Sequence, residues 1–212
     1  LIMALSKIDV ANMLTGTTPV ANGGTGVTTS AGLANTSNLV LIKTKTLSSA
    51  STSISFLNSE TDVTFDTTYD TYKFFGTLDY ETDSSVTYIR VSNDGTNLDT
   101  STVYLYDKIA SAGGAVSGTN DSSSSVWQLE DEATGNDTSE HLNFELTIFN
   151  SSFGYTKMLA AVESVRPNNT ACLTFRGARY QNASRVQGIS FFPNSSNNFK
   201  TGSIIAMYGV KS

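Results

Sequence analysis

Short runs in which apolar and polar residues alternate recur along most of this chain and predict β-strands. Alternation with a period of two places one face of a strand in a core and the other face in solvent. Between the runs lie turn-forming clusters such as Asn93-Asp94-Gly95, whose residue types tolerate the backbone angles that reverse a chain. About eleven strands are expected, at residues 39–42, 54–57, 71–78, 86–91, 102–106, 125–129, 142–149, 157–162, 173–175, 188–192 and 202–210.

These strands predict an all-β fold, because short strands at regular spacing are typical of sandwiches and barrels and no long helical periodicity accompanies them. We expect an antiparallel, jelly-roll-like β-sandwich over residues 39–212. Residues 111–125 and 130–140 are long and polar, so we interpret them as loops that exceed ordinary hairpin turns. Long loops on a rigid β-scaffold are common places for recognition.

The first 38 residues have a different composition from the rest of the chain. Residues 15–38 are almost all Gly, Thr, Ser, Asn and Ala, and such a segment buries too little apolar area to offset the entropy of ordering. We therefore predict an extended N-terminal arm over residues 1–38 that is ordered only by contact with other chains. Its apolar residues are the candidates for anchoring: Leu5, Ile8, Val10, Met13 and Leu14.

Charge and composition narrow the classes of partner. The formal net charge is −6 and Lys and Arg are scattered, which disfavours nucleic acid as a ligand. No run of about 18 apolar residues predicts a transmembrane helix, and no secretory signal pattern opens the chain, so we expect synthesis in a cytosol without membrane insertion. Met3-Ala4 is a common start of a reading frame, so we expect the natural protein to begin at Met3 or Leu1-Ile2 to be an upstream extension.

Residues with catalytic or metal-binding chemistry are few. His141 is the only histidine and Glu140 is its neighbour, but adjacent residues of a strand point to opposite faces, which makes them poor acid–base partners. One histidine and one cysteine, Cys172, do not supply the three or four nitrogen and sulfur ligands of a zinc site. We predict a protein that is not an enzyme, with no cofactor and no metal ligands, and with Cys172 buried as a small apolar residue.

Two acidic stretches have alternative interpretations. Residues 94–99 carry oxygen ligands at alternating positions but lack the terminal glutamate of an EF-hand loop, so a turn with solvated carboxylates is favoured over a calcium site. Residues 130–132 read Glu-Asp-Glu, a run more typical of a solvated face. The alternative is a divalent ion held by this run together with Asp137 and Glu140, if the loop folds back.

Aromatic residues at alternate strand positions are expected mainly in the core, since their rings fit half-buried pleated surfaces. Three of them flank the long polar loops instead. If these side chains are exposed, their rings can stack on sugars. The candidate glycan-contacting residues are therefore Tyr104, Tyr106 and Trp127.

Residues 19–26 read Pro-Val-Ala-Asn-Gly-Gly-Thr-Gly. This string resembles a P-x-A-N-G-G-T-G motif that recurs in tail-fibre and related virion proteins of tailed bacteriophages, where it follows a short N-terminal anchor. The run at residues 201–211 is similar to the last strand of small β-domains in phage fibre and spike proteins. The resemblance implies a homotrimer and no catalytic residue. Glycine alone fits where three chains meet closely on an axis, so Gly23, Gly24 and Gly26 are candidates for close packing between chains.

We therefore expect a phage virion structural protein, made in the host cytoplasm and exposed on the particle surface. It would be a trimeric short fibre or spike, attached to capsid or tail proteins by its arm and contacting a host surface glycan. A capsid decoration or head-fibre protein without a specific receptor is the alternative, favoured by the small size. A glycan-degrading depolymerase needs two carboxylates about 5–10 Å apart, for which Glu140, Glu145 and Glu163 qualify by residue type alone.

Overall fold

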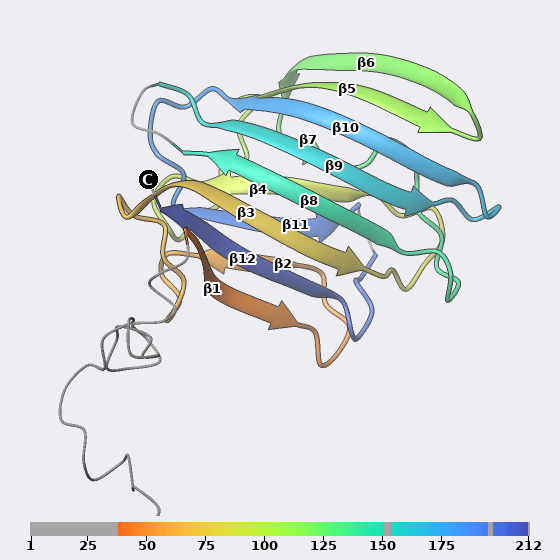
Figure 1. Ribbon diagram of the computed structural model, residues 1–212, viewed down its shortest axis with the longest axis horizontal. Helices are drawn as coiled ribbons and strands as arrows, with labels where there is room; N and C mark the ends of the chain where they lie inside the picture. Colours follow the sequence, from red (N-terminus) through yellow and green to blue (C-terminus); the bar gives the residue numbers. More distant parts are fainter. Residues whose placement is uncertain (1–37, 151–153, 195–196, 212) are drawn as a thin grey trace, which may run out of the picture. The chain divides into compact units, whose positions relative to one another are not determined.

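The residues described by the computed structural model, 38–150, 154–194 and 197–211, form twelve β-strands in two antiparallel sheets (Figure 1). None of these residues is in a helix, so this part of the chain has no helix that is long and apolar enough to cross a bilayer. The strands are β1 (Leu39–Thr46), β2 (Ile54–Leu57), β3 (Tyr69–Leu78), β4 (Thr87–Ser92), β5 (Tyr104–Ala112), β6 (Ala115–Ser124), β7 (Trp127–Gln128), β8 (Leu142–Phe149), β9 (Lys157–Val165), β10 (Ala171–Tyr180), β11 (Gly188–Pro193) and β12 (Ile204–Lys211).

The strand order confirms the predicted jelly-roll-like sandwich. The larger sheet has the order β1-β12-β3-β8-β9-β10-β5-β6, and the smaller sheet has the order β2-β11-β4-β7. Strands β2 and β11, β3 and β8, β4 and β7, and β5 and β6 are hydrogen-bonded neighbours, which is the nested pairing of a jelly roll. The hairpin of β9 and β10 is inserted between β8 and β5, and β12 and β1 extend the larger sheet beyond β3.

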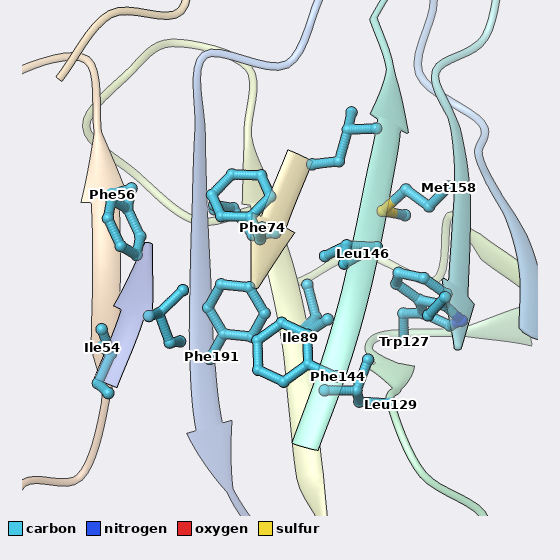
Figure 2. Packing of buried hydrophobic residues seen from close by; sticks show 14 of the residues in the cluster. Ile54, Phe56, Phe74, Ile89, Trp127, Leu129, Phe144, Leu146, Met158 and Phe191 are labelled. Carbon is cyan, nitrogen blue, oxygen red and sulfur yellow. The ribbon is translucent and has the colours of Figure 1, made fainter. Parts of the chain in front are cut away.

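The core lies between the two sheets (Figure 2). Phe191 of the smaller sheet packs against both Phe74 and Phe144 of the larger one, with ring centroids 5.8 and 5.3 Å apart. In β3, Gly76 leaves room for this packing, because a Cβ there would lie 2.5 Å from the Phe144 ring. The alternation that predicted the strands is therefore the alternation of core-facing and solvent-facing positions.

The sequence interpretation missed one strand. Residues 111–125 were expected to be a loop, but most of them form β6, which pairs with β5 at the edge of the larger sheet. Nearly every residue of β6 is exposed, so neither face of the strand needed apolar residues and no alternation marked it. Gly113 and Gly114, with φ values of 55° and 86°, make the tight turn between β5 and β6.

The predicted arm falls outside the described residues. The start of the natural protein also lies outside them, and the predicted boundary after residue 38 stays a prediction because the arm on one side of it is not described. The anchoring and close-packing residues that lie in this part of the chain are Leu5, Ile8, Val10, Met13, Leu14, Gly23, Gly24 and Gly26.

Candidate functional site

Two of the three predicted glycan-contacting aromatics are buried. Trp127 and Tyr104 are both 0% exposed. The Tyr104 hydroxyl accepts the Val91 N–H and donates to the Asp99 carbonyl, at 3.0 Å in each case, and burial raises its pKa. Neither ring has a face in solvent on which a sugar could stack, so the prediction is wrong for these two residues. They are core residues because they point between the sheets at the inward positions of β7 and β5.

Tyr106 is the third predicted contact and lies differently. Its side chain is only partly buried, and its ring lies 5.1 Å from the guanidinium of Arg176 and packs against the core, on the same side of β5 as Tyr104. The residue also borders a hollow of about 650 Å³ in the larger sheet, which the outward side chains of neighbouring strands line. Burial, followed by the nearby Asp121 carboxylate, raises the pKa of its hydroxyl. A role for Tyr106 in ligand contact stays a prediction.

The hollow that Tyr106 borders lies across strands β5, β6, β8, β9 and β10. One row of neighbours across the sheet runs from Phe149 through Lys157 and Arg179 to Leu105. The next row contains Gly177, where an added Cβ would meet nothing within 4 Å. The missing side chain at Gly177 leaves the space between its larger neighbours open.

The lining of this hollow combines apolar and charged groups. Phe149 and Leu159 supply exposed apolar surface, while Arg179 and Asp107 supply charges of opposite sign. Apolar walls with a few converging polar groups are typical of sites that bind a ligand. The arrangement is suited to binding, and the sequence signal that could have indicated it is the run of apolar residues from Met158 to Val162, which places Leu159 and Ala161 on the outward face of β9.

A second hollow, of about 460 Å³, contains two of the three carboxylates considered for glycan cleavage. Glu145 forms an ion pair with Lys73, and Glu163 accepts a hydrogen bond of 2.9 Å from the Asn143 side-chain amide. The third carboxylate, Glu140, is 1% exposed and accepts the Asp137 N–H at 3.1 Å. The structure therefore brings Glu145 and Glu163 to one surface and buries Glu140.

The turn at residues 94–99 is held by its own first carboxylate. Asp94 Oδ1 accepts the N–H groups of Thr96 and Asn97 at 2.8 and 2.7 Å and the Ser92 hydroxyl at 2.9 Å. These hydrogen bonds, with the Asn97 side chain first among them, lower the pKa of Asp94. Among the residues that the structure describes, no group of three or more His, Cys, Asp or Glu side chains could hold a metal ion.

The acidic run at residues 130–132 is not the solvated face that the sequence favoured. Glu130 is 0% exposed. Its Oε1 accepts the Thr87 N–H at 2.7 Å and the Tyr80 hydroxyl at 2.9 Å. Asp131 pairs with Lys108, and Glu132 pairs with Arg166. Glu130 and Asp131 are drawn inward because their carboxylates meet hydrogen-bond donors and a cation there, whereas the Glu132 side chain stays 38% exposed.

The buried Glu130 predicts an unusual dependence of stability on pH. Burial raises the pKa of Glu130 to about 8 from an ordinary value of 4.5. Between these values the folded state holds a proton that the unfolded state has lost, so the free energy of unfolding falls as pH rises, by about 1.4 kcal/mol per pH unit. Glu130→Gln keeps the acceptor oxygen and cannot ionise, so its stability should not show this fall.

Urea unfolding of both proteins at several pH values from about 4.5 to about 8 measures this difference. The two curves should diverge as pH rises, with the glutamine variant the more stable at the alkaline end. Parallel curves for the two proteins would contradict the buried, proton-holding state of Glu130.

The remaining reactive residues sit apart from the hollows. Cys172 is buried, as predicted, and its Sγ lies 3.6 Å from the Thr170 carbonyl oxygen, to which it donates. His141 is half-buried.

Comparison of the chain with models of protein families and with curated proteins gave no match. The class that the fold defines is an antiparallel β-sandwich with jelly-roll-like strand pairing.

Proposed function

We propose that this chain is a structural protein of a tailed-bacteriophage particle, a homotrimeric short fibre or spike attached by its N-terminal arm and directed toward the host surface. The observation that carries the proposal is the Pro-Val-Ala-Asn-Gly-Gly-Thr-Gly string at residues 19–26 ahead of a jelly-roll-like body. A fold by itself does not define a function, so the leader motif carries the assignment and the fold is compatible with it.

In this role the body contacts the host surface, and the hollow bordered by Phe149, Leu159 and Arg179 is the candidate contact. A surface glycan suits such a lining, because apolar groups can cover the faces of sugar rings while Asp, Asn and Arg side chains bond their hydroxyls. Three copies on one particle component would multiply a weak site through avidity.

A capsid decoration or head-fibre protein is the second candidate. The observation that favours it is the short distance in sequence between the leader motif and β1, which begins at Leu39 and leaves no room for a long shaft between the two. Such a protein would occupy the particle surface without a specific receptor.

The arm is the element to test first. Deleting residues 3–26 should leave a soluble β-body that no longer joins particles, because the apolar residues of the arm are then missing. Incorporation is measured by immunoblotting purified particles after complementation with the full chain or the deletion. Normal incorporation of the deletion would contradict attachment through the arm.

The same purified body tests the proposal that the protein is not an enzyme. The exposed carboxylate of Glu145 forms an ion pair with Lys73, and that of Glu163 accepts a hydrogen bond from the Asn143 side-chain amide. Both carboxylates are therefore held by neighbouring side chains, as is common on a surface without catalytic function. Incubation with host polysaccharide should release no reducing ends. Sustained release, abolished by Glu163→Gln, would replace the proposed role with that of a depolymerase.

A further inference from the structure

The outer face of the larger sheet is unusually apolar for a surface. Large hydrophobic side chains that are at least a third exposed come from all eight of its strands, and none of those described comes from β2, β4, β7 or β11 of the smaller sheet. The residues that define this apolar face are Phe75, Ile109, Val116, Phe149, Leu159, Leu173, Phe175 and Ile204.

The register places these side chains next to one another. Phe175 of β10 lies directly opposite Ile109 of β5, and directly opposite residues of an antiparallel pair share a face. Leu173, two residues from Phe175 on the same strand, continues through Ser111 to Val116 of β6. The apolar face is therefore continuous across strands at this end of the sheet.

Strand β10 has the opposite orientation from the one that its composition favours. Thr174 and Arg176 are about 1% exposed, whereas Leu173 and Phe175 are 45% and 52% exposed. A strand that faced plain solvent would bury the two hydrophobic residues and expose the threonine and the arginine. The inverted pattern is explained if a further layer of protein covers the outer face.

The exposed apolar area matches that of a protein interface. With about 150–250 Å² for each side chain, the range for aromatic residues, the exposed fractions of the eight residues amount to roughly 600–1,000 Å². The largest apolar patch of a typical monomer is about 300–600 Å², and a standard interface buries about 800 Å² per partner. The face is large enough to form one side of such an interface.

The charges on this face favour a second copy of the same chain as the occupant. The outward residues of β3, β5, β8, β9 and β10 include three cations, Lys73, Lys157 and Arg179, and three anions, Asp107, Glu145 and Glu163. On these five strands the outward charges cancel, although the whole chain carries a net charge of −6. Two copies that meet through this face therefore avoid the repulsion that their other surfaces would produce.

The shape of the outer face also allows the same face of a second copy to pack against it. Phe175 stands between the two hollows, because Leu173 borders the hollow of about 460 Å³ and Gly177 borders the one of about 650 Å³. A projecting aromatic ring flanked by recesses can insert into the recess of a neighbouring copy, as interface cores require close packing.

We propose that copies of this chain associate through the outer face of the larger sheet, with Phe175 and Ile109 near the centre of the contact. This inference deepens the homotrimer of the proposed function by assigning the surface that forms it, and it does not depend on attachment to a particle. The hollows would then lie at the boundary between subunits, where residues of two copies line them.

Light scattering coupled to gel filtration tests the assignment on the full chain. The wild-type protein should be an oligomer at micromolar concentration. Ile109→Glu and Phe175→Glu should each weaken association by roughly 30-fold or more, the effect of losing a central interface residue. Phe192→Glu is the matched control, because Phe192 points outward from β11 on the smaller sheet, and it should leave the oligomer unchanged.

A second measurement does not depend on disrupting the contact. Ile109→Cys introduces an accessible thiol in a chain whose own cysteine is buried. Its reaction with a maleimide should be slow in the oligomer and should accelerate on dilution, whereas Thr96→Cys in the exposed turn should react fast at all concentrations.

The outcomes of these experiments distinguish a wrong assignment of the interface from a wrong proposal of the virion function. An oligomer that persists in both glutamate variants with a freely reactive Cys at position 109 overturns the assigned face and leaves the trimer intact. A wild-type monomer overturns both the face and the trimer. Failure of the full chain to join particles bears on the proposed virion role alone.

Discussion

Replacing Trp127 with alanine should lower the free energy of unfolding by about 3–5 kcal/mol. Trp127 is fully buried in β7, where it pairs with Ile89 of β4 and lies among the core side chains of both sheets (Figure 2). The loss combines the transfer free energy of the ring with the cavity that it leaves, because the surrounding strands relax only partly. Urea unfolding followed by far-ultraviolet circular dichroism measures the change without relying on tryptophan fluorescence.

Tyr155→Ala is the comparison for this variant. Tyr155 is 46% exposed and its ring lies beside the Arg179 guanidinium at 5.2 Å, so its removal should cost less than about 1 kcal/mol. The opposite result would be a Trp127→Ala protein that is as stable as the wild type but binds glycan less well. That result would contradict the burial of Trp127 and support the predicted contact with a glycan.

Asp131→Asn should destabilise the fold by about 3–5 kcal/mol, the effect of breaking a buried ion pair from one side. Asp131 is 10% exposed, forms an ion pair with Lys108 and lies 4.0 Å from the guanidinium of Arg176. Lys108 and Arg176 are directly opposite each other on β5 and β10, and both point inward. Without the carboxylate the two cations would face each other across the strands with little solvent to screen them.

The neighbouring Glu132 provides a control of the same chemistry. Its ion pair with Arg166 has side-chain exposures of 38% and 30%, so Glu132→Gln should change stability by no more than about 1 kcal/mol. Urea unfolding at neutral pH compares the two variants. Equally small effects of the two variants would mean that the inward placement of Asp131 is wrong.

The longer strands could be predicted from the sequence because their alternating apolar residues are the residues that pack in the core. The run at residues 142–149 is the strand β8 in full, and the antiparallel sandwich was predicted from such runs together. Strand β6 was missed because it is an exposed edge, where pairing through backbone hydrogen bonds needs no apolar face. The inward orientation of the Glu130 and Asp131 side chains could not be predicted, because their partners, Thr87 and Lys108, are remote in sequence.

The candidate site was less accessible to sequence reasoning. Alternation shows that two faces exist but not which one meets the core, and for Trp127 and Tyr104 proximity to polar loops was misleading. In β10 the burial predicted for Cys172 is confirmed, and Leu173 and Phe175, on the opposite side of the strand, point outward. The alternation of Leu173, Thr174, Phe175 and Arg176 is regular, so only the positions of β5 and β9 show that the polar residues are the buried ones.

The nesting of the strands also determines when this protein can fold. Strand β11 lies between β2 and β4, and β12 lies between β1 and β3, so each sheet receives an interior strand from the segment that leaves the ribosome after Gly188. Folding must therefore follow synthesis of this segment and proceed through contacts distant in sequence, which makes it slow. A nascent chain arrested before that point lacks an interior strand in both sheets, so premature termination gives a polypeptide that cannot complete the sandwich.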